Sequence, residues 1–345
     1  MDKPPGKTQP PATGYRYNCV NKSILEPVVI KYYASHFFKW IPRKLTANWI
    51  TLISCGLMWL LLFLAHQAGH FSTATLTLAF VFIIHFYMLG DILDGMQAKH
   101  TGTSSPLGEF LDHYLDIYNS AICLAGFYVL VQLDNPGIYY FMLWLSYAAF
   151  AATMVEEKER GQLYFGPIGS FEGLILILIF FLSWLIPTVQ TFWKTPAWQD
   201  YPAYWLIIIM GLMGFAGTVR DAIKRIGYSP RQFIVFCVGS LFLSLALMKT
   251  PASLWEGWFL LAFYSGDYTG RVMESYHLKQ KHPYPDYFLT GAAFFLFADS
   301  LLHILSATEC LNLIHILTLY MAIACLWNLI KTLKSLWHHW LWVNP

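Results

Sequence analysis

The stretch GDILDGMQAKHTGTSSPLGEFLDHYLD, residues 90–116, lies between two long apolar runs. It carries five acidic residues, Asp91, Asp94, Glu109, Asp112 and Asp116. Charged side chains are costly inside a membrane and usually mark a functional site when they occur there. The spacing of these carboxylates is therefore the first clue to how the chain folds and to what it does.

The composition is that of a membrane protein. Of the 345 residues, 57% are hydrophobic and only 12% are charged, whereas soluble proteins carry about 25% charged residues. The net charge of +2 and the lack of a basic cluster argue against nucleic-acid binding. Residues 1–22 are mostly polar and Pro-rich, so we expect a disordered cytoplasmic tail there and no cleaved signal.

Hydrophobic runs predict the fold class. About ten of them are long enough to span a bilayer, which takes about 20 apolar residues. We place them near 47–66, 71–90, 110–133, 137–155, 171–191, 202–222, 232–249, 253–273, 284–306 and 310–333. The sequence thus predicts an all-α, polytopic integral membrane helical bundle. We expect one membrane-embedded domain over residues 23–345, with its functional core at about 45–200.

Residues 24–45, ahead of the first run, alternate apolar and basic positions at helical spacing. This pattern predicts an amphipathic helix lying on the membrane surface, although an ordinary helix packed on the bundle would show the same pattern. Lys and Arg residues orient the bundle: 20 of the 22 fall on one side of the predicted spans, and only Lys194 and Lys249 fall on the other. The positive-inside rule then places both termini and the acidic stretch in the cytoplasm.

The acidic residues form two pairs on neighbouring helices. Asp91 and Asp94 are three residues apart, and Asp112 and Asp116 are four apart, so each pair shares a helix face. Four converging carboxylates repel each other without a counter-charge. Oxygen ligands suit magnesium, manganese or calcium, and a pair of such cations suits phosphoryl transfer. We therefore predict two Mg²⁺ ions, with Mn²⁺ as the alternative.

Three further residues of the stretch have predicted roles. Gly95 and Gly108 lack side chains beside the acids, which lets a ligand or another backbone approach closely. His113 borders the acidic helix face, where carboxylates would raise its basicity. It is a candidate general base for an alcohol nucleophile.

The stretch resembles the signature of the CDP-alcohol phosphotransferase family, D-x2-D-G-x2-A-R-x8-G-x3-D-x3-D. Seven positions match in identity and spacing: Asp91, Asp94, Gly95, Ala98, Gly108, Asp112 and Asp116. One position departs, because the family arginine is Lys99 here. Lysine keeps the positive charge but cannot form the two-pronged hydrogen bonds of a guanidinium.

Flanking segments resemble the choline/ethanolamine phosphotransferase branch of that family. They are TGTSSPLGEFLDH, the segment from Leu25 to Leu52 and GQLYFGPIGSFEG, so the resemblance covers residues 25–175. It implies that the four aspartates bind magnesium, and that Lys99 and Asn48 contact the CDP-alcohol. It also implies that His113 accepts the proton and that Glu172 raises its basicity, with Asp116 as the alternative base. Asn48 could instead cap the first helix, and Glu172 could be an interfacial acid at a helix start.

The implied activity is transfer of phosphocholine or phosphoethanolamine from CDP-choline or CDP-ethanolamine to diacylglycerol. Phosphatidylcholine or phosphatidylethanolamine and CMP would be the products. The branch further implies a homodimer in the endoplasmic reticulum or Golgi, while a bacterial inner membrane fits the same topology. Alternatives are a family member with another head group or acceptor, an ion-coupled transporter, and an inactive lipid-binding relative suggested by Lys99.

Acids elsewhere in the predicted spans leave two interpretations open. Asp267 and Arg271 are four residues apart and could form an ordinary ion pair, or with Glu274 could line the cavity. Asp299, inside a predicted span, is a functional candidate by default.

Overall fold

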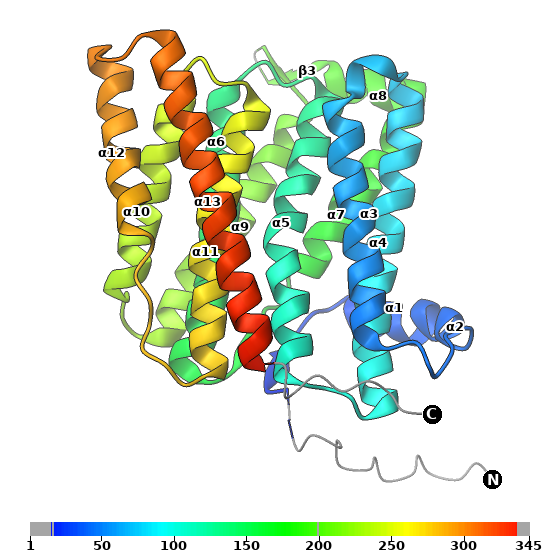
Figure 1. Cartoon of the computed structure of the whole chain (residues 1–345). Coiled ribbons are helices and arrows are strands. Elements are labelled where there is room, and N and C mark those ends of the chain that lie inside the picture. Colours follow the sequence, from blue (N-terminus) through cyan, green and yellow to red (C-terminus); the bar gives the residue numbers. More distant parts are fainter. Residues whose placement is uncertain (1–14, 16, 199, 337–345) are drawn as a thin grey trace, which may run out of the picture.

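The computed structural model describes residues 15, 17–198 and 200–336, and it is a bundle of long helices running side by side (Figure 1). Of the predicted tail, residues 1–22, residues 1–14 and 16 lie outside the described residues. The helices are α1 (Glu26–Val29), the π-helix η1 (Ile30–Ala34), α2 (Ser35–Phe38), α3 (Ala47–His66), the 3₁₀ turn η2 (Ala68–His70), α4 (Thr73–Thr101), α5 (Pro106–Val131), α6 (Pro136–Arg160), α7 (Ser170–Trp184), α8 (Pro187–Lys194), α9 (Trp205–Ile226), α10 (Arg231–Leu247), α11 (Leu254–His277), α12 (Tyr287–Leu302) and α13 (Ala307–Leu336). Four short strands, β1 (Cys19–Asn21), β2 (Leu163–Phe165), β3 (Pro196–Trp198) and β4 (Tyr201–Pro202), complete the described part.

The all-α membrane bundle is confirmed, but the count of ten spans is not. Six helices in the described part are long and apolar enough to cross a membrane, namely α3, α4, α5, α6, α9 and α13. A seventh span arises if α7 and α8, which meet at an angle of 112°, are counted together. The helices α10 and α12 are apolar but shorter, and α11 carries Glu256, Asp267, Arg271 and Glu274.

Local sequence sets where the long helices begin and end. The Ser72 and Ser105 side chains accept hydrogen bonds from the backbone N–H groups at the starts of α4 and α5, as N-cap residues commonly do. Gly102, with φ of 68°, ends α4 in the left-handed conformation that glycine tolerates best. The turn between α4 and α5 is therefore short, and it keeps their acidic ends together.

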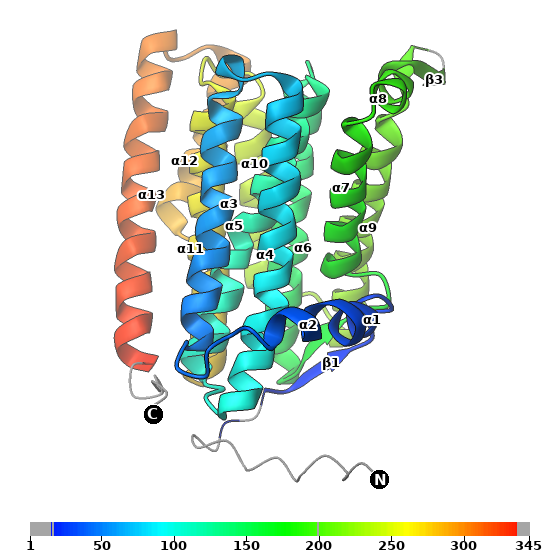
Figure 2. The ribbon, with the colours of Figure 1, turned by 90° about the vertical axis from the view of Figure 1, so that its right-hand side faces the viewer.

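The segment from α1 to α2 lies across one end of the bundle (Figure 2). Its Ala34 is fully buried in a small apolar cluster with Ile50, Leu89, Ile92 and Leu93. On its outer side Trp40 is 85% exposed. One face thus packs on α3 and α4 while the other is left for the membrane interface, which matches the predicted amphipathic helix.

Strand β1 ties the N-terminal segment, residues 17–25, to the end of α6. It pairs in parallel with β2, with Cys19 opposite Leu163 and Asn21 opposite Phe165. The strand lies within the range that the sequence assigns to a tail, so the described chain is ordered from there onward.

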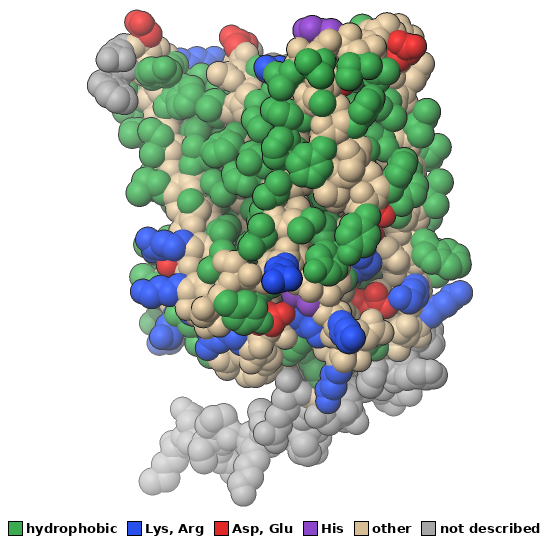
Figure 3. All heavy atoms as spheres, turned by 90° about the vertical axis from the view of Figure 1, so that its left-hand side faces the viewer, with side chains coloured by type: hydrophobic (Ala, Val, Ile, Leu, Met, Phe, Trp, Pro, Cys, Tyr) green, Lys and Arg blue, Asp and Glu red, His purple; other side chains and the backbone are tan. Residues whose placement is uncertain are grey.

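Charge is distributed unevenly along the bundle. Lys and Arg side chains gather toward the end that carries α1 and α2, and hydrophobic side chains cover the middle (Figure 3). Such a distribution is typical of a protein whose basic end faces the cytoplasm.

Helix α11 packs closely against its neighbours through glycines that face tyrosine rings. A Cβ atom at Gly257 would lie 2.7 Å from Cζ of Tyr140 on α6, and one at Gly270 would lie 2.7 Å from Cε2 of Tyr114 on α5. Small residues at such positions let membrane helices approach each other. Because Tyr140 is itself only 1% exposed, it has little room to move away.

We therefore expect Gly257→Ala to lower the free energy of unfolding by about 1–3 kcal/mol, the usual cost of overpacking a core. Thermal unfolding in detergent measures this loss. The matched control is Gly291→Ala on α12, where a Cβ meets open space and the change should cost nothing. Equal thermal stability of the two variants would contradict the close packing at Gly257.

Candidate active site

Three of the predicted metal ligands converge at the basic end of the bundle. Asp91 comes from α4, and Asp112 and Asp116 come from α5. One carboxylate oxygen from each lies within 4.8 Å of the other two. We call these three residues the aspartate cluster.

Neighbouring side chains hold part of the cluster in place. The Tyr87 hydroxyl donates to Oδ1 of Asp116 at 2.7 Å, and Nδ2 of Asn119 donates to the same oxygen at 3.0 Å. The fourth predicted ligand, Asp94, does not belong to the group whose oxygens meet within 4.8 Å. It is only 6% exposed, and its Oδ2 accepts a hydrogen bond of 2.5 Å from Thr51 on α3.

The donor set fits a hard divalent cation. All the candidate ligand atoms are carboxylate oxygens, which magnesium and manganese prefer. Within the described ranges, no Lys or Arg forms an ion pair with Asp91, Asp94, Asp112 or Asp116. The cluster therefore lacks a counter-charge from the protein, and a bound metal ion would supply it.

His113 lies beside the aspartate cluster and is buried, with 7% of its surface exposed. Its Nε2 is 3.9 Å from Oδ2 of Asp112 and 3.5 Å from the hydroxyl of Tyr17. Its Nδ1 is buried and has no hydrogen-bond partner among the described residues. Such a histidine, next to a metal-type cluster, is well placed for proton transfer.

Two glutamates that the sequence analysis did not assign also surround His113. A carboxylate oxygen of Glu109 on α5, one of Glu157 on α6 and a ring nitrogen of His113 all lie within 4.8 Å of one another. The Tyr15 hydroxyl donates a hydrogen bond to Glu109. We call Glu109 and Glu157 the glutamate pair. Glu157 could have been suspected from the pair of acids ending an apolar run at Glu156 and Glu157.

Glu172 has other partners in the structure. Its Oε1 accepts hydrogen bonds from the Ser23 hydroxyl at 2.5 Å and from the Ile24 and Leu25 backbone at 3.0 and 3.2 Å. Its Oε2 accepts one from the Gly169 backbone at 2.8 Å. This carboxylate therefore caps α7 and fastens the N-terminal segment whose Tyr17 reaches His113.

The predicted nucleotide-side residues lie at the ends of α3, α4 and α5. Oδ1 of Asn48 is 3.2 Å from where a Cβ at Gly108 would stand, so these two residues adjoin. A Cβ at Gly95 would meet nothing within 4 Å, which leaves open space beside Asp94. Lys99 is exposed near the end of α4.

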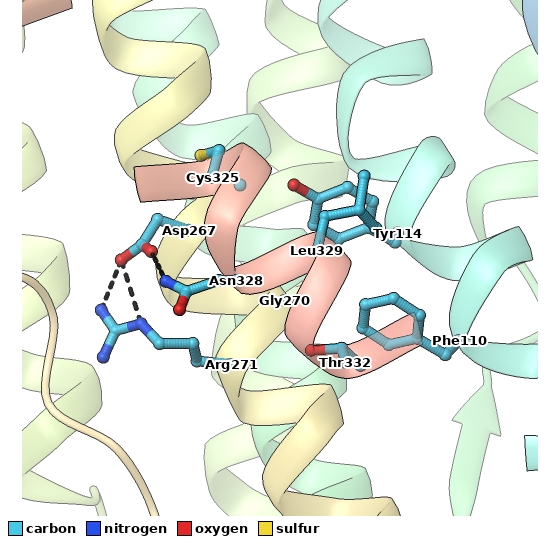
Figure 4. A pocket seen from close by; sticks show the side chains of 10 residues that line it. Phe110, Tyr114, Asp267, Gly270, Arg271, Cys325, Asn328, Leu329 and Thr332 are labelled. Atoms are coloured by element: carbon cyan, nitrogen blue, oxygen red, sulfur yellow. Dashed lines mark hydrogen bonds and ion pairs between the residues drawn. The ribbon is translucent and has the colours of Figure 1, made fainter. Parts of the chain in front are cut away.

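The acids on the C-terminal helices have structural partners. Asp267 accepts hydrogen bonds from Arg271 and from Nδ2 of Asn328, which is 2.7 Å away on α13 (Figure 4). A small hollow beside them is lined partly by Phe110 and Tyr114. The ion-pair interpretation is thus confirmed. Asp299 accepts a hydrogen bond of 2.7 Å from the Leu305 backbone beyond the end of α12, so it stabilises a turn.

The model of the CDP-alcohol phosphatidyltransferase family matches residues 44–217, half of the chain. The chain belongs to this family. The match covers α3 to α6 and therefore all four aspartates, His113 and the glutamate pair. The family is named for transferases, and the described part of this chain carries six helices long and apolar enough to cross a membrane.

Curated relatives agree with the choline/ethanolamine phosphotransferase branch. Cholinephosphotransferase 1 of Bos taurus is 28% identical over 218 residues, covering 61% of this chain and 51% of the relative. Cholinephosphotransferase 1 of Saccharomyces cerevisiae is 26% identical over 199 residues, covering 54% and 50%. An uncharacterised class-I family member of Schizosaccharomyces pombe is 29% identical over 171 residues, covering 48% and 44%. The chain thus spans about half the length of the curated relatives it matches.

Divalent cations should stabilise the folded protein through the aspartate cluster. At a Mn²⁺ concentration of about 100 times Kd, the expected gain is about 2.7 kcal/mol, visible as a higher Tm. Asp116→Asn should remove most of this gain, because it takes away a charged ligand. The control, Asp221→Asn, changes an exposed aspartate paired with Arg220 on α9 and should keep it. An undiminished Mn²⁺ effect in Asp116→Asn would exclude the cluster as the metal site.

Proposed function

We propose that this protein transfers phosphocholine or phosphoethanolamine from CDP-choline or CDP-ethanolamine to the hydroxyl of diacylglycerol. The products are phosphatidylcholine or phosphatidylethanolamine and CMP. The observation that carries the proposal is the aspartate cluster beside the buried His113, a cation site next to a proton acceptor. The cholinephosphotransferases among its relatives support this choice of head group and acceptor.

His113 acts as the general base in this proposal. A ring nitrogen takes the proton of the diacylglycerol hydroxyl, and the freed oxygen attacks the phosphorus that carries the head group. A new P–O bond forms to the lipid, the P–O bond to CMP breaks, and CMP leaves with the electron pair. Asp116 is the alternative base. The glutamate pair lies within 4.8 Å of a His113 ring nitrogen.

Asp91, Asp94, Asp112 and Asp116 would hold two magnesium ions, with manganese as a substitute. When bound, such ions neutralise the pyrophosphate and stabilise the CMP leaving group. Asp94 would join the aspartate cluster from its present hydrogen bond with Thr51.

The CDP-alcohol would approach from the ends of α3, α4 and α5. Lys99 supplies positive charge for its phosphates, and Asn48 contacts the nucleotide. Gly95 and Gly108 leave room beside the carboxylates, as the open space at Gly95 supports. Glu172 acts as a positioning residue, because it fastens the segment whose Tyr17 lies 3.5 Å from Nε2 of His113.

We place the site and both termini on the cytoplasmic side of the endoplasmic reticulum or Golgi membrane. The gathering of Lys and Arg at the end with α1 and α2 supports this orientation (Figure 3). CDP-alcohols are water-soluble and diacylglycerol lies in the bilayer, so a site near this end can receive both.

Purified protein with Mg²⁺ and diacylglycerol should release CMP when given CDP-choline or CDP-ethanolamine. Chromatography of the nucleotide products measures it, and omission of diacylglycerol is the control. If CMP is released with neither of these two nucleotides but with another CDP-alcohol, the proposed head group is wrong and the other alcohol takes its place. No release with any CDP-alcohol would overturn the proposed function.

His113→Ala should lower kcat at least about 100-fold, the usual contribution of a general base. Binding of CDP-choline without an acceptor should change little, because the nucleotide contacts other residues. The control variant is His315→Ala, whose histidine pairs with Glu256 on α11. If His113→Ala keeps the wild-type kcat, His113 is not the general base, and Asp116 becomes the candidate.

A further inference from the structure

The two carboxylates of the glutamate pair lie next to each other and are largely buried from solvent. Glu157 is only 2% exposed, and its oxygen lies within 4.8 Å of a Glu109 oxygen. In the part of the chain that the structure describes, neither residue forms an ion pair with Lys or Arg. Lys158, next in sequence, donates instead to the carbonyls of Ser275 and Gln280 at 2.8 and 2.5 Å. Carboxylates this close and this buried are stabilised by a shared proton or by a cation beside them.

The surroundings of the pair favour an organic cation. The Tyr15 hydroxyl donates a hydrogen bond to Glu109. Burial of Tyr15, and secondly the negative charge of Glu109, raise the pKa of Tyr15, so its hydroxyl stays protonated and remains a donor. The ring of Tyr17 lies 6.2 Å from that of His113, centroid to centroid. His113 is buried, and no described residue forms a hydrogen bond with its Nδ1. Aromatic faces combined with carboxylates are suited to ammonium groups.

The geometry points to the glutamate pair, walled by Tyr15 and Tyr17, as the site that binds the ammonium of the CDP-alcohol head group. This inference rests on the proposed function. The head group is bonded through oxygen to the same phosphorus that the lipid hydroxyl attacks. Its site must therefore adjoin the base, and the glutamate pair shares His113 with the aspartate cluster.

A third metal ion is the competing occupant. A hard divalent cation usually takes six or more oxygen ligands, several of them water. The glutamate pair and His113 instead offer two carboxylates and a ring nitrogen, beside tyrosine side chains. An ammonium needs only negative charge and aromatic faces, which this site provides.

The test compares CDP-choline with CDP-3,3-dimethylbutanol, in which an uncharged carbon replaces the quaternary nitrogen. Binding is measured by calorimetry with Mg²⁺ and without diacylglycerol, so that no transfer occurs. Wild type should bind CDP-choline at least about tenfold more tightly, the equivalent of 1.4 kcal/mol. Glu157→Gln should bring the two affinities to within about threefold by weakening CDP-choline alone.

Two further variants make the test decisive. Glu109→Gln, at a partly exposed position, should act in the same direction and serves if Glu157→Gln does not fold. Glu159→Gln, also on α6 but bound to Tyr228 and His282, should keep the preference for CDP-choline. Metal content is measured for every variant.

The outcomes separate the two proposals. If the glutamine variants keep the preference, or if they lose one equivalent of bound metal, the head-group site is overturned while the proposed function stands. If wild-type protein binds no CDP-alcohol, both are overturned.

Discussion

Carboxylates inside an apolar helical bundle need a hydrogen-bond donor, a proton or a cation beside them. Much of this structure follows from that constraint. Asp267 has Arg271 and Asn328, Asp94 has Thr51, and Glu156 has Arg225 at 2.6 Å. Among the described residues, neither the aspartate cluster nor the glutamate pair forms an ion pair with Lys or Arg. Both groups adjoin His113, so the unbalanced charge is concentrated where chemistry is proposed.

Rigid helices hold these acids in place. The aspartate cluster lies on two helices that share a short turn, capped by Gly102 on one side and Ser105 on the other. The glutamate pair joins α5 to α6. Tyr15 and Tyr17, which lie outside the helices, also reach the site. Fixed acids and a separately attached covering segment suit a site that is proposed to admit both a nucleotide and a lipid.

Local features were predictable from sequence, and long-range features were not. Four-residue spacing placed Asp112 and Asp116 on one face, because helix geometry is the same everywhere. Spacing could not show that Thr51 holds Asp94 or that Glu157 approaches His113, since these contacts join helices far apart in sequence. The count of ten spans is not confirmed, for a related reason. The helices α10 and α12 are short and α11 is charged, so protein neighbours as well as lipid shape them.

The pairing of β1 with β2 has a consequence for biosynthesis. Residues 19–25 leave the ribosome early. The strand partners of Cys19–Asn21 at Leu163–Phe165, and Glu172, which accepts from Ser23, emerge only after α3 to α6 have been made. This early segment can therefore dock only after α3 to α6 have been made. Until it does, the surroundings of His113 are incomplete, and membrane insertion of the first half of the bundle precedes assembly of the working site.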